Sequence, residues 1–275
     1  MKRTFFIILA ILTGIYLIVC AAIYGFQRKI IFQPSHATDP PPGDLGITEV
    51  YFPTVEGQQL HGWWMPVDSS EYTLLFFHGN AGCVSNGVER MRFFRELGYS
   101  TLMIDYRGYG KSTGELLEEE DIYEDARATL AYVKDSLHVP PEKLIVWGWS
   151  LGGGVTTEVC QNLPVAAVVL EGTFFNLDEI AGAAYPLFPV KYLLQYHFRS
   201  SEKIQHFKSP VYFVHSINDG TIPHKQGRKL FEAANTRKAF LTIDGSHNHG
   251  YYEFKSEVIT GFRKFLKDQE MAGIN

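Results

Sequence analysis

The stretch Ile145-Val146-Trp147-Gly148-Trp149-Ser150-Leu151-Gly152-Gly153-Gly154 decides how this chain folds. It begins as a β-branched and aromatic run, typical of a buried strand, and continues into a helical pattern. The motif G-x-S-x-G therefore falls at a turn from strand to helix, where a strained serine needs small neighbours. Ser150 would stand at the helix N-terminus, which favours developing negative charge. The pattern predicts Ser150 as a nucleophile.

A serine nucleophile needs hydrogen-bond donors for the oxyanion that forms when it attacks a carbonyl group. A predicted strand ending at Phe77 is followed by His78-Gly79-Asn80-Ala81-Gly82, a loop of the kind that donates one backbone N–H. We expect the N–H groups of Asn80 and of Leu151, the residue after the nucleophile, to form the oxyanion hole. His78 is interpreted as a residue that shapes this loop.

The acid that orients the catalytic base should follow a later strand. Asp219 lies in the turn Asn218-Asp219-Gly220 after the strand-like run 211–214, and we predict that it is this acid. Turn chemistry alone would also explain these residue types. Glu171, at the end of the preceding predicted strand, is the alternative acid.

The base should come one strand later still, in the chain order serine, acid, histidine. The segment Gly245-Ser246-His247-Asn248-His249 follows the strand-like run 239–243. His247 is the first histidine after that run, so we predict that it is the base. His249 adjoins the next helix and is assigned a supporting role there.

Short β-branched or aromatic runs alternate with helical patterns through most of the chain. Such alternation predicts an α/β fold, with a mostly parallel sheet and helices on both faces, after an initial β-hairpin over 47–65. The predicted strands are 72–77, 101–104, 144–147, 166–170, 211–214 and 239–243, and the predicted helices are 86–97, 118–136, 151–162, 224–234 and 250–267.

The connection over about 172–208 is rich in aromatic residues and far longer than the usual connection in a compact domain. A small cap over a pocket would account for it. A pair of helices that fills core space is the alternative.

No residue is charged from Phe5 to Phe26, and Lys2-Arg3 and Arg28-Lys29 flank this run. A helix of this length crosses about 30 Å of hydrocarbon, so residues 1–29 are predicted to be a single-pass membrane anchor. A cleaved signal peptide is the alternative, but the run exceeds the usual apolar region of about 7 to 15 residues. A proline-rich linker is predicted over 30–45, and the folded domain with the predicted nucleophile, acid and base over 46–275.

Two basic residues flank each end of the apolar run, so their charges give little indication of its orientation in a membrane. No Lys or Arg occurs between Lys29 and Arg90. We expect the N-terminus on the cytoplasmic side and the following domain on the other side.

The 275 residues are 45% hydrophobic and 20% charged, with a net charge of -5, which is ordinary globular composition without the basic excess typical of nucleic-acid binding. The acidic residues between Glu115 and Asp125 are interpreted as a solvated helix start. The three cysteines show no CxxC spacing, so no zinc ribbon or redox motif is predicted. The predicted serine chemistry implies no metal or organic cofactor. Cys83 and Cys160 are interpreted as free thiols, with a disulfide as the alternative.

Together these motifs resemble the alpha/beta-hydrolase superfamily over about residues 47–268. HGNAG at 78–82, DYRGYGKS at 105–112, GWSLGG at 148–153, the Asp219 turn and GSHN at 245–248 are similar to its membrane-anchored Bem-type branch, related to the serine aminopeptidase-like hydrolases. In that branch the catalytic histidine is followed directly by asparagine, which corresponds to His247. Two positions depart from the pattern: Ser216 replaces a frequent glycine, and Gly172-Thr173 replaces a more usual serine-proline.

The resemblance and the residues imply a membrane-anchored serine hydrolase. We expect acyl esters or thioesters as substrates, carried by a small molecule, a lipid or an acylated protein, because an aromatic cap and a membrane tether suit apolar acyl chains. A serine aminopeptidase-like peptidase and a catalytically silent binding protein of the same fold are the alternatives, because a fold does not choose a substrate.

Overall fold

A computed structural model of the chain, which describes residues 1–271 and 273, contains one eight-stranded sheet in the order β10-β9-β8-β7-β4-β6-β3-β2. β2 and β3 form the predicted hairpin and β3 pairs antiparallel with β6, whereas all other neighbours are parallel. The predicted α/β fold is confirmed. The strands are β2 (Thr48–Pro53), β3 (Gln59–Met65), β4 (Thr73–Phe77), β6 (Ser100–Asp105), β7 (Leu144–Trp149), β8 (Ala167–Glu171), β9 (Val211–Ser216) and β10 (Lys238–Ile243).

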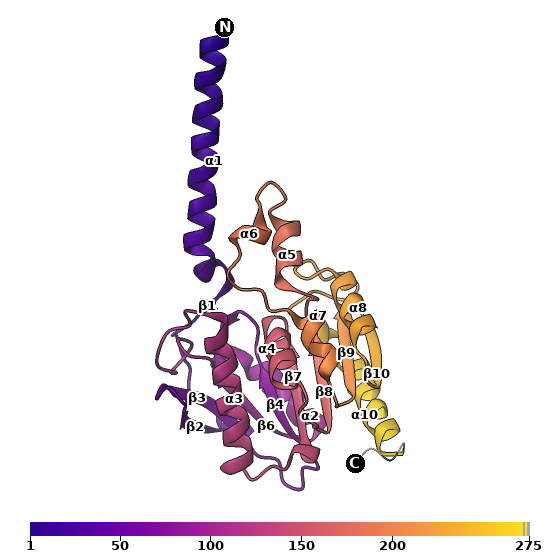
Figure 1. Cartoon of the computed structure of the whole chain (residues 1–275). Coiled ribbons are helices and arrows are strands. Elements are labelled where there is room, and N and C mark those ends of the chain that lie inside the picture. Colours follow the sequence, from indigo (N-terminus) through magenta and orange to yellow (C-terminus); the bar gives the residue numbers. More distant parts are fainter. Residues whose placement is uncertain (272, 274–275) are drawn as a thin grey trace.

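Helices cover both faces of the sheet and close a hydrophobic core on each (Figure 1). On one face Ile122, Val155 and Leu230 from α3, α4 and α8 are fully buried, and on the other face Phe94 and Phe262 from α2 and α10 are fully buried. Each such side chain contributes about 1.5–3 kcal/mol by leaving water. These helices are α2 (Val88–Leu97), α3 (Glu119–Asp135), α4 (Leu151–Val159), α8 (His224–Ala233) and α10 (Lys255–Met271).

Some helices differ in extent from those predicted. The helix predicted over 151–162 stops at Val159, because Gln161 leaves it to bridge Phe207 and Asn162 adopts a positive φ of 56°. The helix predicted over 250–267 is two helices, α9 (Gly250–Glu253) and α10, separated at Phe254. The helix predicted over 86–97 is the 3-10 turn η2 (Val84–Gly87) followed by α2.

The N-terminal apolar run is the helix α1 (Lys2–Ile31), which projects away from the sheet (Figure 1). Its most apolar window has a mean hydropathy of 2.8. Within residues 1–271 and 273, α1 alone is long and apolar enough to cross a membrane. The helix continues two residues beyond the predicted anchor boundary at residue 29.

The proline-rich segment after α1 lies against the domain. Its strand β1 (Gln33–Pro34) pairs in parallel with β5 (Ala81–Gly82), and Phe32 and Leu45 are buried. Leu45 belongs to a short 3-10 turn, η1 (Gly43–Leu45). Because of this packing, the end of α1 is placed beside the loop that carries Asn80.

The long connection between β8 and β9 serves both of the roles that the sequence left open. Its later part fills core space, since Tyr196, Phe198 and Ile204 are buried. Its earlier part stands beside the base of α1 at one end of the sheet (Figure 1). The helices of this connection are α5 (Leu177–Ala184), α6 (Val190–Leu193), α7 (Ser200–Lys203) and the 3-10 turn η4 (Ile204–His206).

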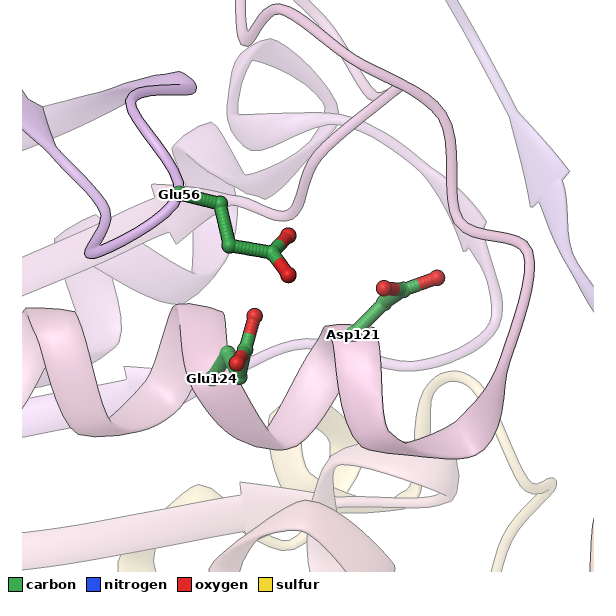
Figure 2. Close-up of side chains that lie close together, drawn as sticks. All are labelled: Glu56, Asp121 and Glu124. Atoms are coloured by element: carbon green, nitrogen blue, oxygen red, sulfur yellow. The ribbon is translucent and has the colours of Figure 1, made fainter.

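The acidic start of α3 is only in part the solvated helix start interpreted from the sequence, because Glu118 and Glu120 are exposed but Asp125 is fully buried. Asp121 and Glu124 point toward Glu56 from the hairpin turn (Figure 2). The buried guanidinium of Arg107 bonds all three carboxylates at 2.9–3.0 Å and also bonds the fully buried Asp125 at 2.8 Å. The sequence could not indicate this, because the acidic block looks the same with or without a buried partner.

Candidate active site

Ser150 lies at the sharp turn between β7 and α4, where its backbone has φ 55° and ψ −120°. This positive φ strains a residue with a side chain. The turn also requires glycine on either side. A Cβ at Gly148 would lie 2.3 Å from Thr156 Oγ1, and a Cβ at Gly152 would lie 2.0 Å from the carbonyl oxygen of Phe77 in β4. The G-x-S-x-G motif is therefore fixed here by the close approach of α4 to the neighbouring strand.

We predict that Gly152→Ala lowers the free energy of unfolding by at least about 2 kcal/mol, because its methyl group overlaps backbone that cannot move aside. Gly182→Ala in α5 is the control, since a Cβ there meets no atom within 4 Å. That change should raise stability by about 0.5–1 kcal/mol. Urea unfolding of the detergent-solubilised full chain, followed by tryptophan fluorescence, measures both. Equal midpoints for the two variants would contradict this account of the turn.

The structure brings Ser150, His247 and Asp219 together from three separate loops. His247 Nδ1 lies 2.6 Å from Asp219 Oδ2, and His247 Nε2 lies 3.0 Å from Ser150 Oγ. All three side chains are largely buried. With the Nδ1 proton donated to the carboxylate, Nε2 is left to accept the hydroxyl proton.

Asp219 is held as a carboxylate by its surroundings. Burial raises the pKa of Asp219, but the nearby rings of His215 and His247, 3.5 and 2.6 Å from Oδ2, and the N–H of Ile222 outweigh it, so the pKa lies well below its ordinary value. Asp219 Oδ1 accepts the N–H groups of Thr221 and Ile222 at 2.9 and 2.7 Å. These bonds fix Oδ1 of the carboxylate, and Oδ2 faces His247.

The loops that carry Asn80 and Ser150 follow two neighbouring parallel strands, β4 and β7, on either side of the point where the chain reverses its direction across the sheet. Such a point is where parallel sheets bind ligands. Within the described residues, the N–H groups of Asn80 and Leu151 donate to no protein acceptor. Both residues line the same cavity as Ser150.

Asn80 is held in place by the segment that follows the apolar helix. Its carbonyl oxygen accepts the N–H of Gln33 at 2.9 Å and the hydroxyl of Tyr109 at 2.8 Å. Its side-chain amide donates to the carbonyl oxygen of Ile31, the last residue of α1, at 2.9 Å. The position of the Asn80 N–H therefore depends on contacts with α1 and β1.

Glu171, the alternative acid, is directed away from His247. Its carboxylate forms two hydrogen bonds with buried Arg90, at 2.7 and 2.9 Å, and accepts the indole N–H of Trp147 at 2.8 Å. Its carbonyl oxygen accepts the N–H of Ser150 at 2.9 Å. Glu171 therefore supports the turn at Ser150 from behind, and Asp219 is the carboxylate that meets the imidazole.

We predict that Glu171→Gln lowers the free energy of unfolding by about 3–5 kcal/mol, because it leaves the Arg90 guanidinium buried without an anionic partner. Glu142→Gln, at an exposed position, is the matched control and should change it by less than about 0.5 kcal/mol. The measurement is urea unfolding of the full chain in detergent. A Glu171→Gln protein as stable as the control would show that the buried pair does not support the fold.

The other residues considered from the sequence lie apart from this chain of hydrogen bonds. His249 is exposed at the start of α9, where Ser246 Oγ is 3.3 Å from its Nδ1. His78 is buried, bonds the carbonyl oxygen of Gly79 at 2.7 Å and has its pKa lowered by burial, in keeping with a role in shaping the loop. Cys83 and Cys160 are free and buried.

A cavity of about 210 Å³ opens beside Ser150 and is lined mostly by apolar side chains. Leu177 and Ile180 of α5 form one wall, and Ile30 and Ile31 at the end of α1 form another. The sequence predicted a cap over a pocket but not a wall from the apolar helix. The sequence also assigned no role to His215, whose Nε2 lies 3.5 Å from Asp219 Oδ2.

A family model for the alpha/beta hydrolase fold matches residues 72–194. A protein of Mycobacterium tuberculosis named only as uncharacterised is 30% identical to this chain over 256 residues, which cover 91% of each chain. The chain belongs to the alpha/beta hydrolase family.

Two further comparisons bear on this family. The lysophosphatidylserine lipase ABHD12 of Danio rerio is 31% identical over 221 residues, which cover 72% of this chain and 55% of the lipase. The crystal structure of the Pyrococcus furiosus esterase Pf2001 superposes with a TM-score of 0.70 over 86% of this chain and 98% of the esterase, at 19% identity. That superposition supports the fold alone.

Proposed function

We propose that this protein is a membrane-anchored serine hydrolase that cleaves acyl esters or thioesters through an acyl-enzyme intermediate. The observation that carries the proposal is the continuous line of hydrogen bonds from Ser150 Oγ through His247 to Asp219. A hydroxyl group is a weak nucleophile, and an imidazole within hydrogen-bond distance supplies the base that it lacks.

The proposed reaction has two halves. His247 Nε2 takes the proton from Ser150 Oγ as the oxygen attacks the acyl carbonyl carbon, and the N–H groups of Asn80 and Leu151 stabilise the resulting oxyanion. The tetrahedral intermediate collapses, and the imidazolium gives its proton to the departing alcohol or thiol. A water molecule, deprotonated by the same imidazole, then attacks the acyl-enzyme and releases the acid and free Ser150. These steps use only groups of the chain and water.

The cavity and one relative support the proposed substrate class. Apolar side chains from α5 and α1 suit an acyl chain, whereas a peptide would need polar partners for its amide groups. A relative of 31% identity is named as a lysophosphatidylserine lipase. We therefore favour an ester or thioester with an apolar acyl group over an aminoacyl peptide.

We propose the division of the chain expected from the sequence: an anchor over 1–29, a linker over 30–45 and a hydrolase domain over 46–275 with a cap over about 172–208. The apolar length of α1 supports the anchor. The N-in orientation stays a prediction, because basic residues flank both ends of α1.

The two histidines of the segment 245–249 should differ sharply in their effect on ester hydrolysis. We expect His247→Ala to lower kcat by roughly 10⁴-fold or more, because the base is removed. His249→Ala is the matched control and should leave kcat within about twofold, since His249 is exposed and lies at a helix start. Asp219→Asn should lower kcat by roughly 10⁴-fold by favouring the wrong tautomer of the imidazole.

These values are measured on the full chain in detergent with a p-nitrophenyl ester, a matched acyl thioester and an aminoacyl amide. We expect turnover of the ester and thioester to exceed that of the amide. A larger loss with His249→Ala than with His247→Ala would reverse the assignment of the base. Preferential turnover of the amide would favour the peptidase alternative.

A further inference from the structure

The segment 185–193 of the cap lies along α1 well above the body of the domain (Figure 1). The hydroxyl of Tyr16 donates to the carbonyl oxygen of Leu187 at 3.2 Å, and the rings of Tyr16 and Phe188 stack 5.7 Å apart. Nearer the domain, the side-chain amide of Gln27 donates to the carbonyl oxygen of Leu193 at 3.0 Å. The cap segment thus follows about three turns of α1.

These contacts place the tip of the cap at the depth of the apolar part of the helix. Tyr16 precedes Arg28, the first basic residue after the apolar run, by twelve residues, which corresponds to about 18 Å along the helix axis. The hydrocarbon region of a bilayer is about 30 Å thick. If α1 spans a membrane, Leu187 lies within the layer that surrounds α1 and not above it.

The exposed side chains of the segment suit such a layer. Leu187 and Tyr192 are each 81% exposed, and Tyr185 is 41% exposed. Tyrosine is favoured where hydrocarbon meets headgroups. Lys191 carries the only charge of the segment, and its long side chain can reach the headgroup region.

Most backbone N–H groups of the segment also have hydrogen-bond acceptors within the protein. This is required in hydrocarbon, where no water is present to accept from them. Positions 186 and 189 are prolines and have no N–H to satisfy. The N–H groups of Tyr185, Phe188, Val190 and Tyr192 each donate to a carbonyl oxygen within the cap. A loop in water has no such need, because water satisfies its backbone groups.

The same elements enclose the cavity at the nucleophile. Ala184 at the end of α5 and Tyr185, the first residue of the cap segment, line it, and so do Ile30 and Ile31 of α1 and Ser150 itself. The first residue of the cap segment and the end of α1 therefore border the same cavity as the serine hydroxyl.

We propose that the cap segment 185–193 inserts into the bilayer beside α1, and that the acyl chain of a lipid ester from that bilayer passes between them to Ser150. This inference rests on the proposed function and narrows it. The substrate is a membrane lipid with an ester-linked acyl chain, and the cap segment is the second element, besides the anchor, that contacts the bilayer.

Insertion is tested without catalysis on the full chain reconstituted in phosphatidylcholine vesicles. Leu187→Cys carries an environment-sensitive fluorophore, and Val55→Cys, at a 96% exposed position in the β2–β3 turn, is the matched control. The wild-type chain, whose three cysteines are buried, measures background labelling. Lipids brominated in their acyl chains should quench more than about half of the fluorescence at position 187 and little at position 55. Equal, weak quenching at both positions would overturn insertion.

Delivery of substrate is tested with a monoacyl phospholipid held in the same vesicles and with a short-chain soluble ester. A charge at position 187 is unfavourable in hydrocarbon, so Leu187→Asp should lower vesicle-lipid hydrolysis by about tenfold or more. It should leave short-ester hydrolysis within about twofold, because Leu187 does not line the cavity, and Val55→Asp should change neither.

An equal loss on both substrates in Leu187→Asp would overturn delivery past the cap, as would an unchanged rate on the vesicle lipid. If the wild-type chain hydrolyses neither substrate while position 187 is quenched, the proposed function and the delivery of substrate both fail, and insertion of the cap segment alone is supported.

Discussion

The positive φ at Ser150 is held where α4 packs so closely on β4 that a Cβ on Gly152 would lie 2.0 Å from the carbonyl oxygen of Phe77. This approach turns the serine hydroxyl out of the helix and sets Leu151 N–H beside the loop that carries Asn80. Glu171 supports the same turn from β8 through its carbonyl oxygen, while its carboxylate neutralises Arg90. The geometry of the whole site depends on this one crowded turn.

The sequence predicted the three residues that meet at the site because each follows its own strand of a parallel sheet. Ser150, Asp219 and His247 are the polar residues that come after β7, β9 and β10, and parallel strands bring such residues to one edge. Strand positions were predicted within one or two residues for the same reason, since runs buried on both faces are unmistakably apolar. From the sequence, the choice of Asp219 over Glu171 as the acid depended only on which predicted strand each residue follows.

Other features depend on partners that are distant in sequence. Nothing near Glu171 indicates that Arg90, 81 residues earlier, neutralises its carboxylate. The burial of Asp125 against Arg107 likewise requires the hairpin turn and α3 to meet, so the acidic block looked like an ordinary helix start. Contacts between α1 and the cap, such as that from Tyr16 to Leu187, join segments that are far apart in the sequence. The hydrophobic pattern of each segment predicts its own structure but not its contact with the other.

These distant contacts also connect the apolar helix with the chemistry. The carbonyl oxygen of Ile31 accepts a hydrogen bond from the side chain of Asn80, and Asn80, Ile30 and Ile31 all line the cavity. The end of α1 therefore packs directly against the candidate site. The most direct test of the central claim is mass spectrometry of the full chain after reaction with a fluorophosphonate. We predict one adduct, on the peptide that contains Ser150, and no adduct in Ser150→Ala. An adduct that persists in Ser150→Ala, or none on the folded wild-type chain, would contradict the assignment of this site as a serine hydrolase centre.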